Sequence, residues 1–142
     1  MLENKSYQLY NNVTQLQASD LSSNMYKSDN FISDLINSYA WDTAIYFLQV
    51  FGNNKKYSMQ ASLNTGVIAL KGTDNDVQCN VYDMASNIRE WTTENYLEKN
   101  LLGTIRGGAY GDSSLNSSKR ASISNSYSSN GIGFRPILYI NN

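Results

Sequence analysis

Apolar residues in the first part of the chain recur about one helical turn apart. The repeat begins behind a capping-type asparagine, Asn12, and continues to Tyr26, a spacing typical of a helix with one buried face. Its apolar positions are Val13, Leu16, Ala18, Leu21 and Met25. We therefore expect a helix over Asn12–Tyr26.

Two further periodic stretches follow a polar break at residues 27–30. Their apolar residues are Phe31, Leu35 and Tyr39 in the first stretch, and Trp41, Ile45, Leu48 and Phe51 in the second. The helix-breaking run Gly52-Asn53-Asn54 ends the pattern. Each stretch is predicted to be a helix, with its aromatic and aliphatic residues packed in the core.

Beyond residue 54 the chain consists of short apolar segments between turn-forming residues, a texture typical of short strands and irregular loops. The expected strands are Val67–Leu70, Asn80–Tyr82, Asn87–Thr92, Thr104–Arg106 and Gly133–Ile140. Because proline cannot donate a backbone hydrogen bond, Pro136 indicates that the last strand lies at a sheet edge or begins near the proline. Helices first and strands later favour an α+β fold, and 142 residues fit one domain.

The composition points to a folded domain with a surface suited to contact. Hydrophobic residues make up 41% of the chain and charged residues 16%, and eleven tyrosines against four phenylalanines supply rings with a polar tip. The chain has a net charge of −1, and its basic residues are scattered, so it lacks the positive patch that nucleic-acid binding needs. The longest apolar stretch, Ala44–Phe51, is far shorter than the roughly twenty residues of a membrane span. We expect neither nucleic-acid binding nor membrane insertion.

The scarcity of cysteine and histidine removes whole classes of chemistry. Cys79 is the single cysteine, and the chain has no histidine. An internal disulfide, the Ser-His-Asp and Cys-His nucleophile pairs and the usual zinc ligand sets are therefore excluded. We interpret Cys79 as a small buried hydrophobic residue.

The segment Tyr110–Asn130, called the serine-rich segment below, differs from the rest of the chain in composition. It holds nine Ser, three Asn and two Tyr, with hardly an aliphatic residue beyond Leu115 and Ile123. Two interpretations are open. Composition by itself favours a flexible low-complexity loop. The alternative is a binding surface, in which Tyr supplies contact area and Ser, Gly and Asn supply adaptable hydrogen bonds.

Three motifs in the second half of the chain resemble those of a known family. Residues 80–92, NVYDMASNIREWT, are similar to the pattern N-x-Y-D-M-x-G-N-V-x-E-W-T, residues 106–110 to R-G-G-S-[WFY], and residues 131–135 to a closing I-G-F-R strand. These are signatures of the formylglycine-generating enzymes, the sulfatase-modifying factor branch of the C-type lectin fold, and they occur here in the family's order. The resemblance implies an α+β, C-type-lectin-like fold, with helices packed on small twisted antiparallel sheets and long loops.

Weaker similarity extends upstream. Val13-Thr14-Gln15-Leu16 and Ala18 resemble the V-[ST]-x-x-x-A that opens a helix in the family, and residues 37–48 resemble the stretch around its tryptophan, here Trp41. The resemblance implies a single C-type-lectin-like domain over residues 1–142 that lacks the family's first strand. A trimmed chain, a fragment, or a strand supplied by a partner explains such a gap.

The resemblance does not extend to the family's catalytic residues. Oxidase-type members bind copper through a cysteine pair between the R-G-G and G-F-R motifs, and this chain has no cysteine from Arg106 to Asn142. Iron-dependent relatives require histidine ligands, which are also absent. We therefore expect a protein that is not an enzyme and that binds no copper, iron or zinc.

Non-catalytic relatives imply a binding role. In the variable proteins of diversity-generating retroelements, the stretch between the R-G-G and G-F-R motifs is the diversified ligand-binding surface, and similar domains occur in phage structural proteins and bacterial surface proteins. We expect residues 109–130 to bind a cell-surface glycan or a protein. The alternative is an assembly module of a phage virion or a surface appendage, contacting other copies or neighbours; either role implies an extracellular, cell-surface or virion location. The candidate ligand-binding residues are Tyr110, Asp112, Ser113, Asn116, Asn125 and Tyr127.

The resemblance also implies a structural calcium ion. Carried over position by position, the ligands are the Asp83 side chain, the backbone carbonyls of Ser86 and Ile88, and the Glu90 side chain. Oxygen ligands suit this hard cation. Ser86 stands where the family has glycine, so strain is expected there if the position requires a positive φ. Alternatively, Asp83 and Glu90 cap turns and pair with Arg89 or Lys71, and the residues leave calcium and no metal equally open.

Two arginines beside glycines, Arg106 and Arg135, admit two roles. They are anchors for an anionic ligand through bidentate hydrogen bonds, or they are buried and paired with Glu90 or Asp83; we favour the second role. We expect Trp41 and Trp91 in the core.

Overall fold

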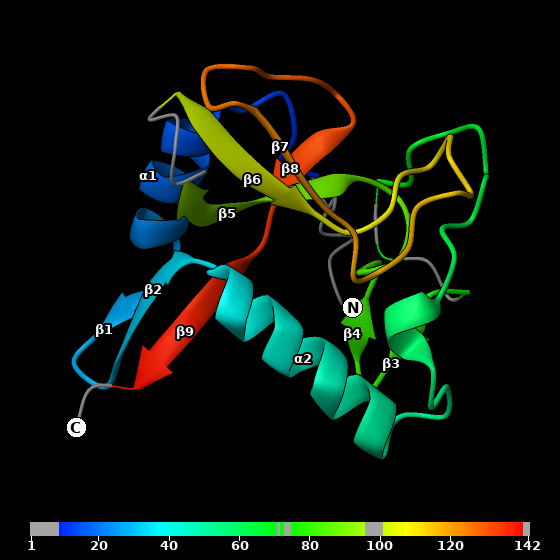
Figure 1. Cartoon of the computed structure of the whole chain (residues 1–142). Coiled ribbons are helices and arrows are strands. Elements are labelled where there is room, and N and C mark those ends of the chain that lie inside the picture. The colour runs from blue at the N-terminus through cyan, green and yellow to red at the C-terminus, as the bar shows by residue number, and fades with distance from the viewer. Residues whose placement is uncertain (1–8, 71, 73–74, 96–100, 141–142) are drawn as a thin grey trace, which may run out of the picture.

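A computed structural model describes residues 9–70, 72, 75–95 and 101–140, and it confirms the α+β class (Figure 1). The elements are α1 (Gln15–Met25), β1 (Lys27–Ser28), β2 (Phe31–Leu35), α2 (Ser38–Phe51), the 3-10 turn η1 (Tyr57–Met59), β3 (Val77–Gln78), β4 (Val81–Tyr82), β5 (Arg89–Asn95), β6 (Leu102–Arg106), β7 (Arg120–Ser124), β8 (Ile132–Phe134) and β9 (Pro136–Ile140). Among the described residues, neither helix is long and apolar enough to cross a membrane.

The expected first helix is present, but it begins after Thr14 rather than at Asn12. The Thr14 hydroxyl accepts a hydrogen bond from the backbone N–H of Gln17, and the Gln17 side chain accepts one from the backbone N–H of Thr14. This reciprocal capping box satisfies two donors that a helix start otherwise leaves unpaired. Asn12 lies just outside, with a positive φ of 57°.

The buried face of α1 is more polar than its apolar spacing predicted. Leu16 and Leu21 are exposed, whereas Gln15, Ala18 and Ser22 are buried. Burial of Gln15 is tolerated because its side-chain amide donates to the carbonyls of Thr92 and Glu94 in β5, at 2.7 and 3.0 Å. A polar contact to a strand far along the chain thus orients the helix.

The prediction of a helix over Phe31–Tyr39 is wrong. Residues Phe31–Leu35 form β2, and Tyr39 belongs to α2. All five residues of β2 pair with β9, from Phe31 opposite Ile140 to Leu35 opposite Pro136. The partner strand comes from the far end of the chain, so a local apolar period could not reveal it.

Helix α2 agrees with the sequence pattern. The Asn37 side chain caps its start by accepting from the N–H of Ala40 at 2.8 Å, and Gly52 ends it with a bond to the Leu48 carbonyl. Its buried stripe is Trp41, Ile45 and Leu48. These residues pack with Ile36, Tyr57, Met84 and Ala85 in one core cluster.

Cys79 is exposed, which corrects its interpretation as a buried hydrophobic residue. It occupies the turn between β3 and β4 with Asn80, and both residues have positive φ angles, 50° and 61°. Two such residues make a tight hairpin turn, which points outward from the sheet.

The strand expected at Val67–Leu70 is also wrong. Val67 and Leu70 are exposed, and the backbone of Ala69 bonds to a side chain instead of to a strand. The N–H of Ala69 donates to the Asn87 amide oxygen, and the Asn87 amide donates to the Ala69 carbonyl. One asparagine therefore satisfies the groups that a neighbouring strand would have paired.

A four-stranded mixed sheet, in the order β7-β6-β5-β8, carries the second half of the fold (Figure 1). Strands β5 and β6, expected over Asn87–Thr92 and Thr104–Arg106, pair antiparallel, whereas β5 and β8 pair parallel. Strand β7 lies within the serine-rich segment and pairs with β6 over five positions. This pairing corrects the interpretation of the whole segment as a flexible loop.

The single strand expected over Gly133–Ile140 is two strands in different sheets. Strand β8 pairs with β5, and strand structure is interrupted at Arg135. Strand β9 begins at Pro136 and lies at the edge of the sheet β1-β2-β9. Both expectations for Pro136 are therefore confirmed. Trp91 is fully buried and belongs to a second core cluster, with Ala18, Leu35, Ile105 and Ile132. Burial of Trp41 and Trp91 confirms their expected place in the core.

Candidate functional site

The motif residues 83–92, called the signature loop below, are buried almost throughout. Residues 83–88 all lie inside the protein, although three of the six are polar. The left-handed backbone positions are Asp83 and Asn87, with φ of 59° and 66°, and Ser86 is not among them. Ser86 is therefore not strained, and its hydroxyl accepts a hydrogen bond from the N–H of Leu63 at 3.1 Å. The polar side chains of Asp83, Ser86 and Asn87 are tolerated in the interior because each has a hydrogen-bond partner.

The R-G-G motif packs directly against the signature loop. Gly107 has a φ of 82°, which favours glycine, and a Cβ on Gly108 would overlap the carbonyl of Ala85. The next residue but one, Tyr110, donates its N–H to the Asn87 carbonyl at 2.7 Å. The start of the serine-rich segment is therefore fixed to the loop by backbone contact.

Glu90, which is buried, and Arg135, which is half-buried, form a two-point ion pair. The Nε and one terminal nitrogen of Arg135 donate to the two Glu90 carboxylate oxygens at 2.9 and 2.8 Å, and Arg135 also donates to the Tyr82 carbonyl. Burial raises the pKa of Glu90, and Arg135 offsets part of that rise. The structural role expected for Arg135 is confirmed, with Glu90 as its partner.

This pairing bears on the four positions carried over for calcium. Both carboxylate oxygens of Glu90 are occupied by Arg135, and the Asp83 side chain accepts from the Asn87 amide at 3.3 Å. No cluster of three acidic, cysteine or histidine side chains suited to a metal ion occurs among the described residues. Asp83, Ile88 and Glu90 line one open pocket together with Arg135, which already bonds to both Glu90 oxygens, so calcium at these positions stays a prediction. Lys71, an alternative partner, lies outside the described residues.

Arg106 is buried as expected, but its partner is a residue that the sequence did not suggest. Its side chain is 5% exposed and pairs with Asp42 of α2, neither Glu90 nor Asp83. The guanidinium also lies over the Trp41 ring, 6.0 Å from the centroid. Asp42 is the partner because the start of α2 lies close to the end of β6, a contact that only the folded chain creates.

The six candidate ligand-binding residues do not form one patch. Four lie in the loop before β7 and two in the turn after it, so the length of β7 separates the groups (Figure 1). Five residues of strand span roughly 17 Å. Asp112, Ser113 and Tyr127 are exposed, whereas Tyr110, Asn116 and Asn125 are half-buried.

The group before β7 is held by short-range bonds. Hydrogen bonds from the hydroxyl and N–H of Ser114 lower the pKa of Asp112. Asn116 accepts from the Ser118 hydroxyl at 2.9 Å, and its backbone forms a bridge with Ala61. This loop displays polar side chains on an ordered backbone.

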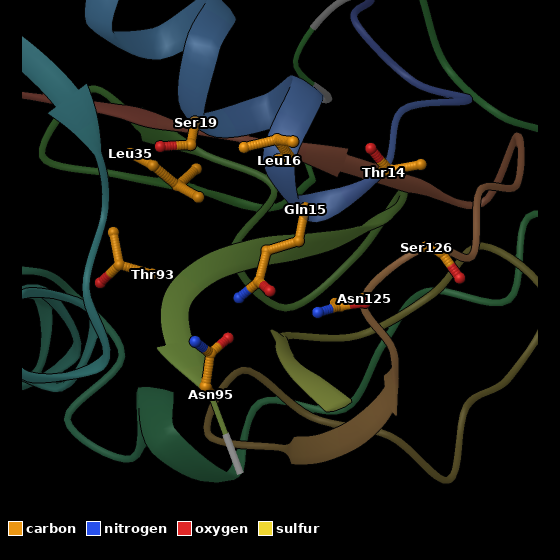
Figure 2. Close-up of a pocket in the computed structure, with 9 residues that line it drawn as sticks. All are labelled: Thr14, Gln15, Leu16, Ser19, Leu35, Thr93, Asn95, Asn125 and Ser126. Carbon is orange, nitrogen blue, oxygen red and sulfur yellow. The ribbon is translucent and has the colours of Figure 1, made fainter. Parts of the chain in front are cut away.

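The group after β7 borders an open pocket of about 490 Å³ (Figure 2). Asn125 and Ser126 line one side, the start of α1 another, and the end of β5 a third. Figure 2 shows the side-chain amides of Gln15, Asn95 and Asn125 turned toward one another. Gln15 and Asn95 were not predicted, because their proximity to Asn125 depends on how α1 packs on β5.

Comparisons with known proteins agree with this architecture. The family model of the sulfatase-modifying factor enzyme 1-like domain matches residues 6–140. Among solved structures, Treponema denticola variable protein 1 matches with a TM-score of 0.62 and 13% sequence identity, over 97% of this chain and 73% of that chain. No curated protein matches. The structural likeness confirms the C-type-lectin-like fold that the motifs implied.

Proposed function

The chain belongs to the family of sulfatase-modifying factor enzyme 1-like domains, and we propose that it is a non-catalytic member that binds a glycan or a protein through residues 109–130. The observation that carries this proposal is the pocket in Figure 2, where the serine-rich segment supplies Asn125 and Ser126 to a cavity whose other walls are regular structure. A cavity of this size with a few convergent polar groups is typical of ligand sites.

The arrangement of the segment supports the same proposal. Strand β7 holds its backbone on the sheet, while polar side chains stand exposed at both ends. Rigid backbone with adaptable polar side chains lowers the entropy that binding costs. The fold that this chain shares with Treponema denticola variable protein 1 supports the comparison with variable proteins.

The absence of catalysis is part of the proposal. The chain has no histidine, its one cysteine is exposed in the β3–β4 turn, and no cysteine lies between the R-G-G and G-F-R motifs. Without histidine, neither a serine nor the cysteine can form the usual pair of nucleophile and imidazole base. We place the domain outside the cell, on a cell surface or on a virion, where such a ligand is met.

Binding by the full chain to a printed panel of glycans and to surface-displayed proteins tests this function. Asn125→Ala and Ser126→Ala should weaken binding to whichever ligand is found, because they remove hydrogen-bonding groups at the pocket. Ser128→Ala, an exposed position of the same turn that does not line the pocket, is the matched control. A ligand that binds all three variants as it binds the unmodified chain would place its site elsewhere.

One observation favours the assembly role as a second candidate. Helix α2 exposes four large apolar side chains on its outer face near its C-terminal end, Tyr46, Phe47, Val50 and Phe51. The rings of Phe47 and Phe51 contact each other at 4.8 Å between centroids. Patches of this kind mark protein contact surfaces. Light scattering across a concentration series tests whether copies associate, and Phe47→Ser with Phe51→Ser should abolish any association.

A further inference from the structure

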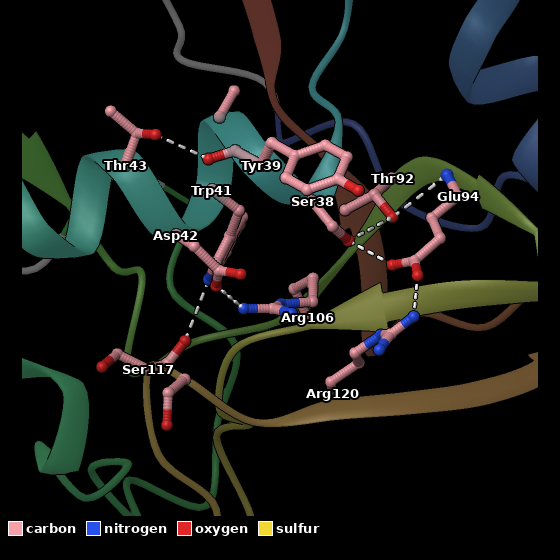
Figure 3. A network of polar contacts seen from close by, with 12 residues as sticks. Ser38, Tyr39, Trp41, Asp42, Thr43, Thr92, Glu94, Arg106, Ser117 and Arg120 are labelled. Carbon is pink, nitrogen blue, oxygen red and sulfur yellow. Dashed lines mark hydrogen bonds and ion pairs between the residues drawn. The ribbon is translucent and has the colours of Figure 1, made fainter.

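A second pocket, of about 470 Å³, lies where the start of α2 meets the ends of β5 and β6 (Figure 3). Its walls carry four charged side chains and one exposed tyrosine: Asp42, Glu94, Arg106, Arg120 and Tyr39. The pocket shares Thr93 and Asn95 with the pocket of Figure 2, so the two cavities lie on either side of the end of β5. Only Arg120 belongs to the serine-rich segment.

The charges of this pocket balance in pairs. Arg106 bonds to Asp42, and Arg120 bonds to Glu94, whose other oxygen accepts from the Ser38 hydroxyl (Figure 3). Two cations and two anions leave no net charge to attract an ion. A charged ligand would pair with one of these groups only by displacing its present partner, so the paired charges favour a neutral ligand.

Arg106 shows that the pocket is more than a gap between surface side chains. Its side chain is 5% exposed, and its Nε is buried without a hydrogen-bond partner among the described residues. Asp42, its only carboxylate partner there, is 61% exposed and thus open to competition from a ligand. Native structures rarely leave a buried donor unpaired, so a water or a ligand group is expected to accept from this nitrogen.

The remaining walls indicate what kind of group fits. Thr93 and Asn95 add a hydroxyl and an amide, and the Tyr39 ring, 88% exposed, stands at the mouth. Carboxylates, guanidinium groups and amides donate or accept in pairs, as adjacent hydroxyls of a sugar require, while an aromatic face covers the C–H side of a sugar ring. No aliphatic side chain is among the residues that line the pocket.

We propose that this pocket binds a neutral sugar unit, by hydrogen bonds to Glu94, Asp42 and Arg120 and by stacking on Tyr39. The proposal rests on the binding function proposed above and names a class of ligand for it. It uses none of the six candidate residues, so its failure leaves the first pocket untouched.

Chemical-shift titration of the nitrogen-15-labelled full chain tests the proposal. The probes are glucose, galactose, mannose and N-acetylglucosamine, with N-acetylneuraminic acid and glycine as acidic and zwitterionic comparators. At least one neutral sugar should shift the amides around Ser38, Glu94 and Arg120 at millimolar concentration. Tyr39→Ala and Arg120→Met should each weaken that affinity by about tenfold or more, because each removes one principal contact.

Matched controls separate this site from general surface effects. Tyr26→Ala removes another exposed tyrosine, and Lys119→Met removes the neighbouring exposed cation; neither residue lines the pocket. Both should retain the affinity of the unmodified chain. The proposal is overturned if no neutral sugar shifts these amides, if the acidic or zwitterionic probe binds more tightly, or if the controls lose as much affinity as the test variants. Loss on Asn125→Ala with no loss on Tyr39→Ala would assign the sugar to the first pocket and reject this one.

Discussion

The signature loop and the serine-rich segment both carry many polar residues, yet one is mostly buried and the other mostly exposed. The loop buries residues 83–88 and satisfies their polar groups internally, through contacts such as Asn87 with Ala69 and Ser86 with Leu63. The serine-rich segment exposes every residue from Gly111 to Ser114 and from Ser126 to Ser128. Polar composition therefore does not decide whether a stretch is scaffold or surface; the presence of internal partners does.

Large-to-small substitution should show the widest gap between the two regions. Trp91→Ala should destabilise the protein by about 3 to 5 kcal/mol, because it empties a fully buried volume and loses the indole bond to the Val13 carbonyl. Tyr127→Ala, at a side chain 47% exposed, should change stability by less than about 0.5 kcal/mol. Urea denaturation measures both. Similar losses would mean that the segment is core rather than surface.

Two glycines sharpen the same contrast at the backbone. Gly108→Ala should cost about 3 kcal/mol or more, because its Cβ would overlap the Ala85 carbonyl, and backbone cannot move aside as a side chain can. Gly111→Ala, where nothing lies within 4 Å, should be nearly neutral. Thermal melts of the two variants give the comparison. A melting temperature for Gly108→Ala close to that of the unmodified chain would show that the loop can shift away from the R-G-G motif.

The calcium prediction asks whether the signature loop rearranges. If the loop binds the ion, calcium at about a hundredfold above its dissociation constant should stabilise the fold by about 2.7 kcal/mol, since it binds only the folded state. Asp83→Ala with Glu90→Ala should abolish the shift, whereas Asp112→Ala, in the serine-rich segment, should retain it. An unchanged melting temperature of the unmodified chain in calcium would reject the assignment and leave Glu90 with Arg135 alone.

The ion pairs of Glu90 with Arg135 and of Glu94 with Arg120 should contribute differently to the free energy of unfolding. Arg135→Ala should cost about 2 kcal/mol or more, because it leaves the buried Glu90 carboxylate without its partner. Arg120→Ala removes a pair whose arginine is 52% exposed, and it should cost less than about 1 kcal/mol. Denaturation at low and high salt measures each, and only the Arg120 variant should approach the unmodified chain as salt rises.

The smallest effect is a difference in pH dependence between Glu90 and Asp112. A raised pKa means that Glu90 stabilises the fold most when the pH is below its ordinary value of 4.5, and that this contribution is lost as the pH rises through the folded-state pKa. The stability difference between the unmodified chain and Glu90→Gln should therefore shrink as the pH rises. Asp112, whose pKa is lowered, should show the opposite trend against Asp112→Asn. If the stability difference between the unmodified chain and Glu90→Gln instead grew toward neutral pH, the ionised pair of Glu90 with Arg135 would outweigh the cost of burying the carboxylate.

The sequence by itself determined the elements whose signals are local or unusually specific. The helix-breaking Gly52, the capping Asn37 and the apolar stripe of α2 lie close together in the chain, and they define that helix without outside help. The three motifs identified the family and fold because their order and spacing are improbable by chance, and they contain the buried Trp91 and the paired Arg135.

Only the tertiary structure decided which distant groups meet. Strand β2 exists because β9 lies beside it, Arg106 pairs with Asp42 because the start of α2 lies near the end of β6, and Gln15 joins Asn95 and Asn125 because α1 packs on β5. The same is true of the split in the serine-rich segment, where pairing with β6 turned residues Arg120–Ser124 into a strand and separated the candidate residues. In each case the stabilising partner is far along the chain, and its contribution is gained only after the loop between them has closed.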